Sequence, residues 1–149
     1  MKIVVVSISS PLLIGVYKDD TLIEEIKQDG KTSDILPMIF HSLLGKYSIS
    51  SIYYVSSPGS YMAIKVAYIF LKTISIVKNI PLKAVSGFEF NNQSPIKALG
   101  KKYFIYDNND IKVDFVDDIS KIQPFSLPSS IKNIDILEDS LPSYNLPVV

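Results

Sequence analysis

Apolar and polar positions in the first part of the chain follow a strand-like pattern in three successive runs. Residues 2–8 are mostly apolar on consecutive positions, which is typical of a strand covered on both faces. An apolar run resumes at residues 12–17 after Pro11, and residues 21–26 alternate after a polar turn. The pattern therefore predicts an antiparallel meander of three strands.

A helical period replaces the strand pattern after residue 31. Thr32 or Ser33 is expected to cap the first helix, Pro37 lies in its early turns, and Gly45 is expected to end it. Its apolar positions recur at spacings of three and four, at Ile35, Met38, Ile39, Leu43 and Leu44. The elements expected next are a strand at 49–55, a turn at 56–59, a helix at 61–78 capped by Ser60, and a strand at 82–86. Together they predict a βαβαβ unit behind the meander.

The pattern of apolar and polar residues changes after about residue 94. Residues 103–106 and 111–115, separated by a polar turn, predict a β-hairpin. From Pro124 onward Pro, Ser and Asn recur every few residues, which is typical of an irregular tail. We therefore divide the chain into an N-terminal α/β domain at 1–94 and a reduced C-terminal segment at 95–149.

Composition excludes several classes of function. The 149 residues suffice for one core, and 15 basic residues balance 15 acidic ones, so direct nucleic-acid binding by this chain alone is not expected. The absence of Cys excludes disulfides and thiolate ligands and favours a cytoplasmic location. Residues 1–7 lack the features of a signal peptide. The apolar stretch 61–77 contains two lysines, so no membrane span is expected.

Motifs for catalysis or cofactor binding are mostly missing from the sequence. No phosphate-binding loop, zinc motif or nucleophile elbow is present, and His41 is expected at the surface, so we predict no catalytic residue, metal site or cofactor. The turn formed by Pro58, Gly59 and Ser60 precedes a helix, where backbone N–H groups can bind an anion. The alternative is a plain strand-to-helix turn, which the single glycine favours.

Three stretches resemble the TsaB family, formerly YeaZ, of bacterial tRNA threonylcarbamoyladenosine biosynthesis proteins. They are residues 1–6 with 12–17, residues 32–39 with their Leu-Pro pair, and residues 57–66, Ser-Pro-Gly-Ser-Tyr-Met-Ala-Ile-Lys-Val. The last is similar to the family's Gly-Pro-Gly-Ser-Phe-Thr-Gly-Leu-Arg-Ile block. Ser7 and Ile8 stand where the family and its ATP-using relatives place Asp and Thr, and Lys65 replaces Arg. The resemblance implies an actin-like (RNase H-like, ASKHA) half-domain, in a divergent member with a truncated second lobe.

The resemblance also implies a function. TsaB proteins are non-catalytic subunits that pair with the catalytic TsaD subunit, which transfers a threonylcarbamoyl group to a tRNA adenosine, and a TsaE-type ATPase joins the same assembly. Family members also form homodimers through the same helical face. We therefore expect a scaffold or activator subunit without enzymatic activity, with a TsaD-type protein as its partner.

The residues of the second predicted helix independently support an interface. Residues 61–78 are apolar nearly all round, and such a helix must be buried on more than one side. We expect Tyr61 and Tyr68 to be hot spots and Lys65 and Lys72 to lie at the rim. The full set of predicted interface residues is Met38, Tyr61, Ile64, Lys65, Tyr68, Ile69, Leu71 and Lys72.

Three alternatives stay open at this stage, and the first is a self-associating homodimer without enzymatic role. Residues 95–149 could fold over the second helix and leave a monomer without such an interface. The chain could instead be a small actin-like ATPase or kinase that uses the turn at 57–60, although Ser7 offers no carboxylate for a magnesium-nucleotide complex. A peptidase is set aside, because it would need a nucleophile with a base and no residue set supplies them.

Overall fold

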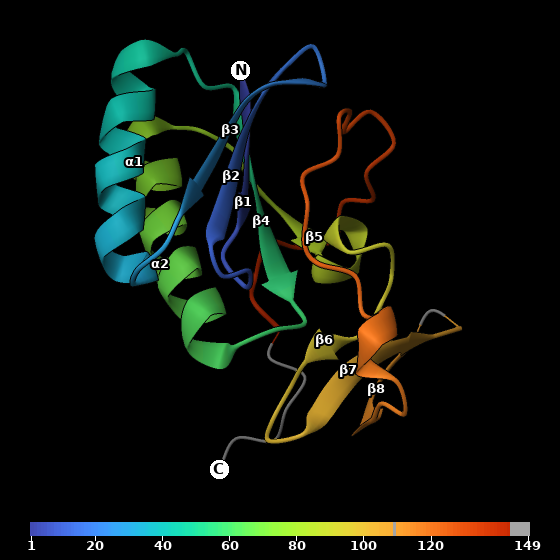
Figure 1. Ribbon diagram of the computed structural model, residues 1–149. Helices are drawn as coiled ribbons and strands as arrows, with labels where there is room; N and C mark the ends of the chain where they lie inside the picture. The colour runs from blue at the N-terminus through green and yellow to red at the C-terminus, as the bar shows by residue number, and fades with distance from the viewer. Residues whose placement is uncertain (109, 144–149) are drawn as a thin grey trace.

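The computed structural model describes residues 1–108 and 110–143, and a five-stranded sheet forms its centre. The strands are β1 (Lys2–Val6), β2 (Leu12–Lys18), β3 (Thr21–Gln28), β4 (Ser51–Ser57) and β5 (Leu82–Ser86), in the order β3-β2-β1-β4-β5. β1 pairs antiparallel with β2 and parallel with β4, and β4 pairs parallel with β5. The predicted meander and βαβαβ unit are confirmed (Figure 1).

Both faces of the central strands are covered, which explains their mostly apolar sequences. Every residue of β4 is buried, and so is all of β2 except its last residue. β3 instead alternates between half-buried and exposed positions, because it lies at the edge of the sheet. The strand at 2–8 was predicted too long, since β1 ends at Val6, and β4 begins and ends two residues later than predicted.

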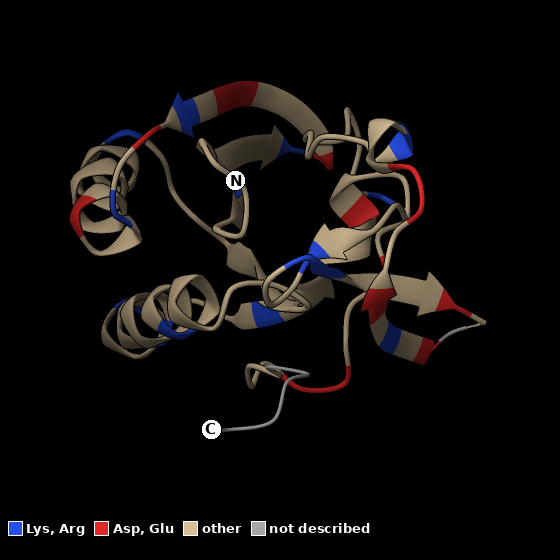
Figure 2. Ribbon diagram, turned by 60° about the horizontal axis from the view of Figure 1, so that its bottom comes forward, with Lys and Arg blue, Asp and Glu red and all other residues tan. Residues whose placement is uncertain are grey.

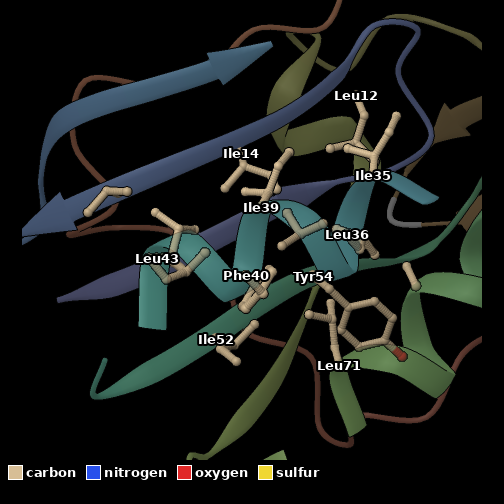
Figure 3. Packing of buried hydrophobic residues seen from close by; sticks show 14 of the residues in the cluster. Leu12, Ile14, Ile35, Leu36, Ile39, Phe40, Leu43, Ile52, Tyr54 and Leu71 are labelled. Atoms are coloured by element: carbon tan, nitrogen blue, oxygen red, sulfur yellow. The ribbon is translucent and has the colours of Figure 1, made fainter. Parts of the chain in front are cut away.

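Helices α1 (Thr32–Lys46) and α2 (Tyr61–Lys78) cover one face of this sheet (Figure 1). The α1 side chains that point at the sheet meet those of β2 and β4, and Leu71 joins them from α2 (Figure 3). Between the helices, the rings of Phe40 and Phe70 make an edge-to-face contact with centroids 5.7 Å apart. The packing of this core determines which sides of the two helices face the solvent.

The ends of α1 differ from the prediction. Lys31, and not Thr32 or Ser33, is the N-cap residue, and Gly45 lies inside the helix, which ends at Lys46. Glu24 of β3 explains the extended C-terminus, because its Oε1 accepts hydrogen bonds from Lys46 Nζ at 3.0 Å and from the Tyr47 hydroxyl at 2.6 Å. These hydrogen bonds, chiefly that from Tyr47, hold the pKa of Glu24 below its ordinary value.

The irregular segment at residues 122–137 crosses the opposite face of the sheet. Ile131 is buried there, and the Tyr17 hydroxyl donates to the carbonyl of Pro128 at 2.7 Å. Backbone bonds run from the Leu22 N–H to Ser129 at one edge of the sheet and from the Leu137 N–H to Ala84 at the other. The predicted irregular tail is confirmed as far as residue 143, and residues 144–149 lie outside the described part.

A second, three-stranded sheet lies beyond the ends of β4 and β5 (Figure 1). It consists of β6 (Ile96–Lys97), β7 (Lys102–Asp107) and β8 (Asp110–Phe115), and the predicted hairpin corresponds to β7 and β8. Asn109, which lies between β7 and β8 in the sequence, is outside the described residues. β6 and the short helices η1 (Gly87–Phe90) and η2 (Ile119–Lys121) were not predicted.

Candidate functional site

The outer surface of α2 carries a row of exposed apolar side chains, Met62, Ile69 and Ile76, which we call the α2 stripe. Their exposed fractions are 60%, 54% and 70%. Because they are spaced by seven residues, about two helical turns, they lie on the same side of the helix. Val77 is exposed beside them. Figure 2 shows both helices largely free of charged residues. Aligned exposed apolar side chains on one helix indicate an interaction surface.

Four of the predicted interface residues lie at the surface. Tyr61, Lys65 and Ile69 are exposed on α2, and Met38 is exposed on the neighbouring helix α1. The Nζ of Lys65 lies 5.6 Å from the centroid of the Tyr61 ring, so the ammonium group covers part of that ring. Tyr61 and Lys65 extend the exposed surface of α2 beyond the stripe, and Met38 is exposed on α1.

Tyr68 and Lys72 are half-buried. The Tyr68 ring lies 5.9 Å from that of Tyr54, whose hydroxyl donates to the carbonyl of Ser140. Part of the Tyr68 side chain therefore packs within its own chain, which leaves Tyr61 as the more accessible of the two predicted hot spots.

Ile64 and Leu71 were predicted at the interface, and for these two residues the prediction is wrong. Both side chains have an exposed fraction of 0%. With Ala67, they form the side of α2 that packs on the sheet. Ile64 and Leu71 thus lie on the inner side of α2, and the exposed apolar row lies on the other side. The seven-residue spacing of Met62, Ile69 and Ile76 was the sequence signal that could have identified the exposed row.

The described part of the C-terminal segment does not cover the α2 stripe. Its apolar side chains Phe125, Leu127, Ile131 and Ile134 pack with β1, β2, β4 and β5 on the sheet face opposite the helices. Figure 1 shows residues 122–137 on that side. The alternative in which residues 95–149 shield the second helix therefore does not hold for the α2 stripe within residues 95–143, and residues 144–149 lie outside the described part.

The turn before α2 is filled by an apolar side chain. A methyl group at Gly59 would collide with Cγ2 of Ile8, and one at Gly87 would lie 2.7 Å from its Cδ1. Ile8 thus occupies the space between two glycines at the carboxyl ends of β4 and β5. Ser60 takes the N-cap position, as predicted, but its side chain makes no capping hydrogen bond. The hydroxyl of Ser7 donates to the carbonyl of Ala63.

A cavity of about 400 Å³ opens beside this turn. Ile8, Tyr61, Leu99 and Phe125 contribute apolar walls, and Lys97 is the charged residue of its lining. The N–H of Ile64 bonds to the carbonyl of Ser60, within the first turn of the helix. The predicted anion site at Pro58, Gly59 and Ser60 remains a prediction, since this apolar lining adds little to it.

A Gly59→Ala substitution is expected to destabilise the protein by about 1–3 kcal/mol, because the new methyl group has to displace Ile8. Urea unfolding followed by circular dichroism measures the loss. The double variant Ile8→Ala/Gly59→Ala removes the collision, so Gly59→Ala is expected to cost less in the Ile8→Ala background than alone. Equal costs in both backgrounds would show that Ile8 does not pack on Gly59.

Titratable groups form no metal site within residues 1–108 and 110–143, where no three His, Cys, Asp or Glu side chains come together. His41 is exposed on α1, as predicted. Neither described helix combines the length and the apolar character that a bilayer crossing requires.

Comparison with solved structures identifies the fold. YeaZ from Pseudomonas aeruginosa superposes with a TM-score of 0.60 at 10% sequence identity, over 77% of this chain and 64% of that one. The chain has the fold of YeaZ. A protein described as similar to the peptidase YeaZ from Pseudomonas aeruginosa superposes with a TM-score of 0.53 at 11% identity, over 77% and 63%. The predicted actin-like α/β half-domain of YeaZ type is thereby confirmed as a fold.

This chain spans less than two thirds of the length of either YeaZ-type structure. No protein-family model matches the sequence, and no curated protein matches it. The comparison rests on fold similarity alone, because the sequence identities are only 10% and 11%. The function of this chain therefore has to be argued from its own surface.

Proposed function

We propose that this chain is a non-catalytic, cytoplasmic scaffold subunit of the tRNA threonylcarbamoyladenosine modification machinery. It binds a TsaD-type catalytic subunit through the outer surface of α1 and α2. The YeaZ fold and the sequence likeness of residues 57–66 support the assignment to this machinery. A TsaE-type ATPase is a further partner under this proposal.

The α2 stripe is the observation that carries the proposal. Met62, Ile69 and Ile76 are exposed on a helix whose inner residues Ile64 and Leu71 anchor it to the sheet. A partner therefore meets a surface that needs little reordering, which lowers the entropic cost of binding. Full burial of one such side chain contributes about 1.5–3 kcal/mol. Helices of the partner that offer an apolar row of their own fit this surface.

Lysines beside the stripe specify the charge of the partner. Lys65 and Lys72 lie on α2 and follow Met62 and Ile69 by three residues each. None of the ion pairs formed among the described residues involves either lysine. Acidic side chains at the edge of the partner's apolar row would complement them, with their main effect on orientation and association rate.

The variant Ile69→Glu is expected to weaken binding to the TsaD-type protein by about 100-fold or more, equivalent to about 2.7 kcal/mol, because it places a carboxylate in the apolar contact. Ile119→Glu is the matched control, since Ile119 is also exposed but lies on η2, away from the helices. Isothermal titration calorimetry with the purified partner measures both affinities, and thermal unfolding checks that both variants fold.

Equal affinity of Ile69→Glu and the unchanged chain for the partner would overturn the proposed interface. Analytical ultracentrifugation of the chain alone addresses the homodimer alternative. If the chain dimerises, and Ile69→Glu makes it monomeric without affecting partner binding, the stripe serves self-association and not the scaffold role.

An actin-like ATPase or kinase is the alternative from the enzyme class. Nucleotide phosphates placed at the turn before α2 would have to displace Ile8 from between Gly59 and Gly87. Magnesium-dependent ATP binding by the isolated chain would nevertheless favour this alternative over the scaffold role.

A further inference from the structure

Strand β8 is an edge strand with an open hydrogen-bonding side. It is the last strand in the order β6-β7-β8, on the side of the small sheet away from α1 and α2 (Figure 1). Residues 122–137 bond to both outer strands of the large sheet, whereas the backbone bonds within 1–108 and 110–143 join β8 to β7 alone. Unpaired backbone groups of this kind are a template for another strand.

The outward backbone groups of β8 belong to alternate residues. The N–H of Ile111 donates to Oδ1 of Asp110 at 2.9 Å, and the N–H of Phe115 donates to Oδ1 of Asp114 at 2.7 Å, so both point away from β7. Backbone groups along an antiparallel strand point alternately to its two sides, so those of Val113 point outward as well. A further strand would therefore bond to residues 111, 113 and 115.

The side chains of β8 alternate between charged and apolar. Ile111 and Val113 are half-buried on the face that packs within the chain. The charged side chains on the other face, all exposed, are those of Asp110, Lys112 and Asp114. A lysine with an aspartate two residues to each side can meet the opposite charge in an antiparallel copy of the same strand.

One register of two β8 strands matches these charges. When Val113 lies opposite Val113 of a second copy, Lys112 faces Asp114 of that copy, and Asp114 faces its Lys112. If the centre moves to Lys112 or to Asp114, that residue faces its own charge, which is destabilising. A centre between two residues sets outward backbone groups against inward ones. Because the contact is two-fold symmetric, the register centred on Val113 forms the Lys–Asp pair twice.

The same register suits the neighbouring groups. Phe115, with an exposed fraction of 61%, lies opposite Ile111 of the second copy and gains an apolar neighbour. Its N–H exchanges the Asp114 carboxylate for the carbonyl of that Ile111, which releases Asp114 to bind the lysine. Lys112 already pairs with Asp107 at 3.7 Å, but both side chains are exposed and such pairs contribute little. None of these exchanges leaves a charge buried.

We propose that the protein forms a symmetric dimer in which two β8 strands pair antiparallel, centred on Val113, and join the two three-stranded sheets into one. Lys112 of each copy binds Asp114 of the other. The contact is small, so the dimer is weak and dissociates on dilution. This inference does not rest on the scaffold function, and it leaves the α2 stripe free for a partner.

Sedimentation velocity of the full chain, over concentrations up to the solubility limit, tests the proposal. Lys112→Asp and Asp114→Lys each turn two opposite-charge pairs into two like-charge pairs, and each is expected to weaken dimerisation about tenfold or more. An equimolar mixture of these two variants is expected to dimerise as the unchanged chain does, because each copy then meets opposite charges on the other. The double variant Lys112→Asp/Asp114→Lys is expected to do so as well.

Lys132→Asp is the matched control, since it makes the same change of charge at an exposed position on the segment 122–137. It is expected to dimerise as the unchanged chain does. The proposal fails if the unchanged chain stays monomeric, if Lys112→Asp and Lys132→Asp dimerise equally, or if the mixture dimerises no more tightly than its components.

The variant Ile69→Glu separates this contact from one through the helices. It is expected to dimerise normally, whereas a dimer that is lost in Ile69→Glu and kept in Lys112→Asp would place the contact at the α2 stripe and refute the pairing of β8. Lys112→Asp is expected to bind the TsaD-type protein with unchanged affinity, so failure of the dimer is distinguishable from failure of the scaffold role.

Discussion

An Ile64→Glu variant is expected to be unfolded, although the same substitution five residues later, at Ile69, leaves the protein folded. Ile64 has an exposed fraction of 0% and lies on the side of α2 that packs on the sheet. A buried carboxylate without a partner costs several kcal/mol, or becomes protonated at a similar cost, while a whole domain is stable by about 5–15 kcal/mol.

Far-UV circular dichroism and urea titration of the two variants measure this difference. Ile64→Val is the control, since it keeps an apolar side chain and is expected to cost about 0.5–1.5 kcal/mol. If Ile64→Glu unfolds cooperatively at the same urea concentration as the unchanged protein, the inner side of α2 does not face the sheet, and the assignment of the α2 stripe as the outer side falls with it.

A Phe40→Ala variant is expected to lose about 3–5 kcal/mol of stability. Phe40 is fully buried and lies between the sheet and α2, where its ring meets Phe70 edge to face. Removing the ring leaves a cavity between the two helices, because the sheet on one side and α2 on the other limit how far they can close.

The loss is measured as the change in the free energy of unfolding, from urea titrations with comparable slopes. Phe115→Ala is the matched control, because Phe115 is exposed on β8 and its truncation is expected to cost about 0.5 kcal/mol or less. Similar losses for the two variants would show that α1 and α2 do not share a packed core.

The strands and α2 could be predicted because their signals are local. β4 is buried along its whole length, so its apolar sequence has few polar interruptions. The bounds of α2 agree with the prediction because Asn79, in a left-handed conformation, ends the helix where the apolar pattern ends. The C-terminus of α1 was not predictable in this way, since Glu24, on β3, bonds the side chains that extend it.

The orientation of α2 about its own axis was the main failure in the candidate site. Apolar residues surround this helix, so the sequence pattern alone gives two rows that could face the sheet. The choice is made by the turn from β4 into α2, where Gly59 packs on Ile8, and by Ala67, whose small side chain lets the helix approach the sheet. Met38, Tyr61, Lys65 and Ile69 remain at the surface under that choice, whereas Ile64 and Leu71 do not.

The path of residues 122–137 across the sheet also could not be predicted from the local sequence. The bond from the Tyr17 hydroxyl to Pro128 joins positions 111 residues apart, and nothing near either residue predicts it. The side of the sheet that the segment covers is decided by such distant contacts. The sequence therefore left open whether the C-terminal segment shields α2.

This crossing segment has a consequence for aggregation. By bonding to Leu22 on β3 and to Ala84 on β5, it occupies backbone groups on both outer strands, which are otherwise templates for pairing with another molecule. The rest of β3 carries Glu24, Glu25 and Lys27, charges that discourage such pairing. Until residues 122–137 have docked, both outer strands are more open, so intermolecular sheet growth is a greater hazard for the nascent or partly unfolded chain than for the folded one.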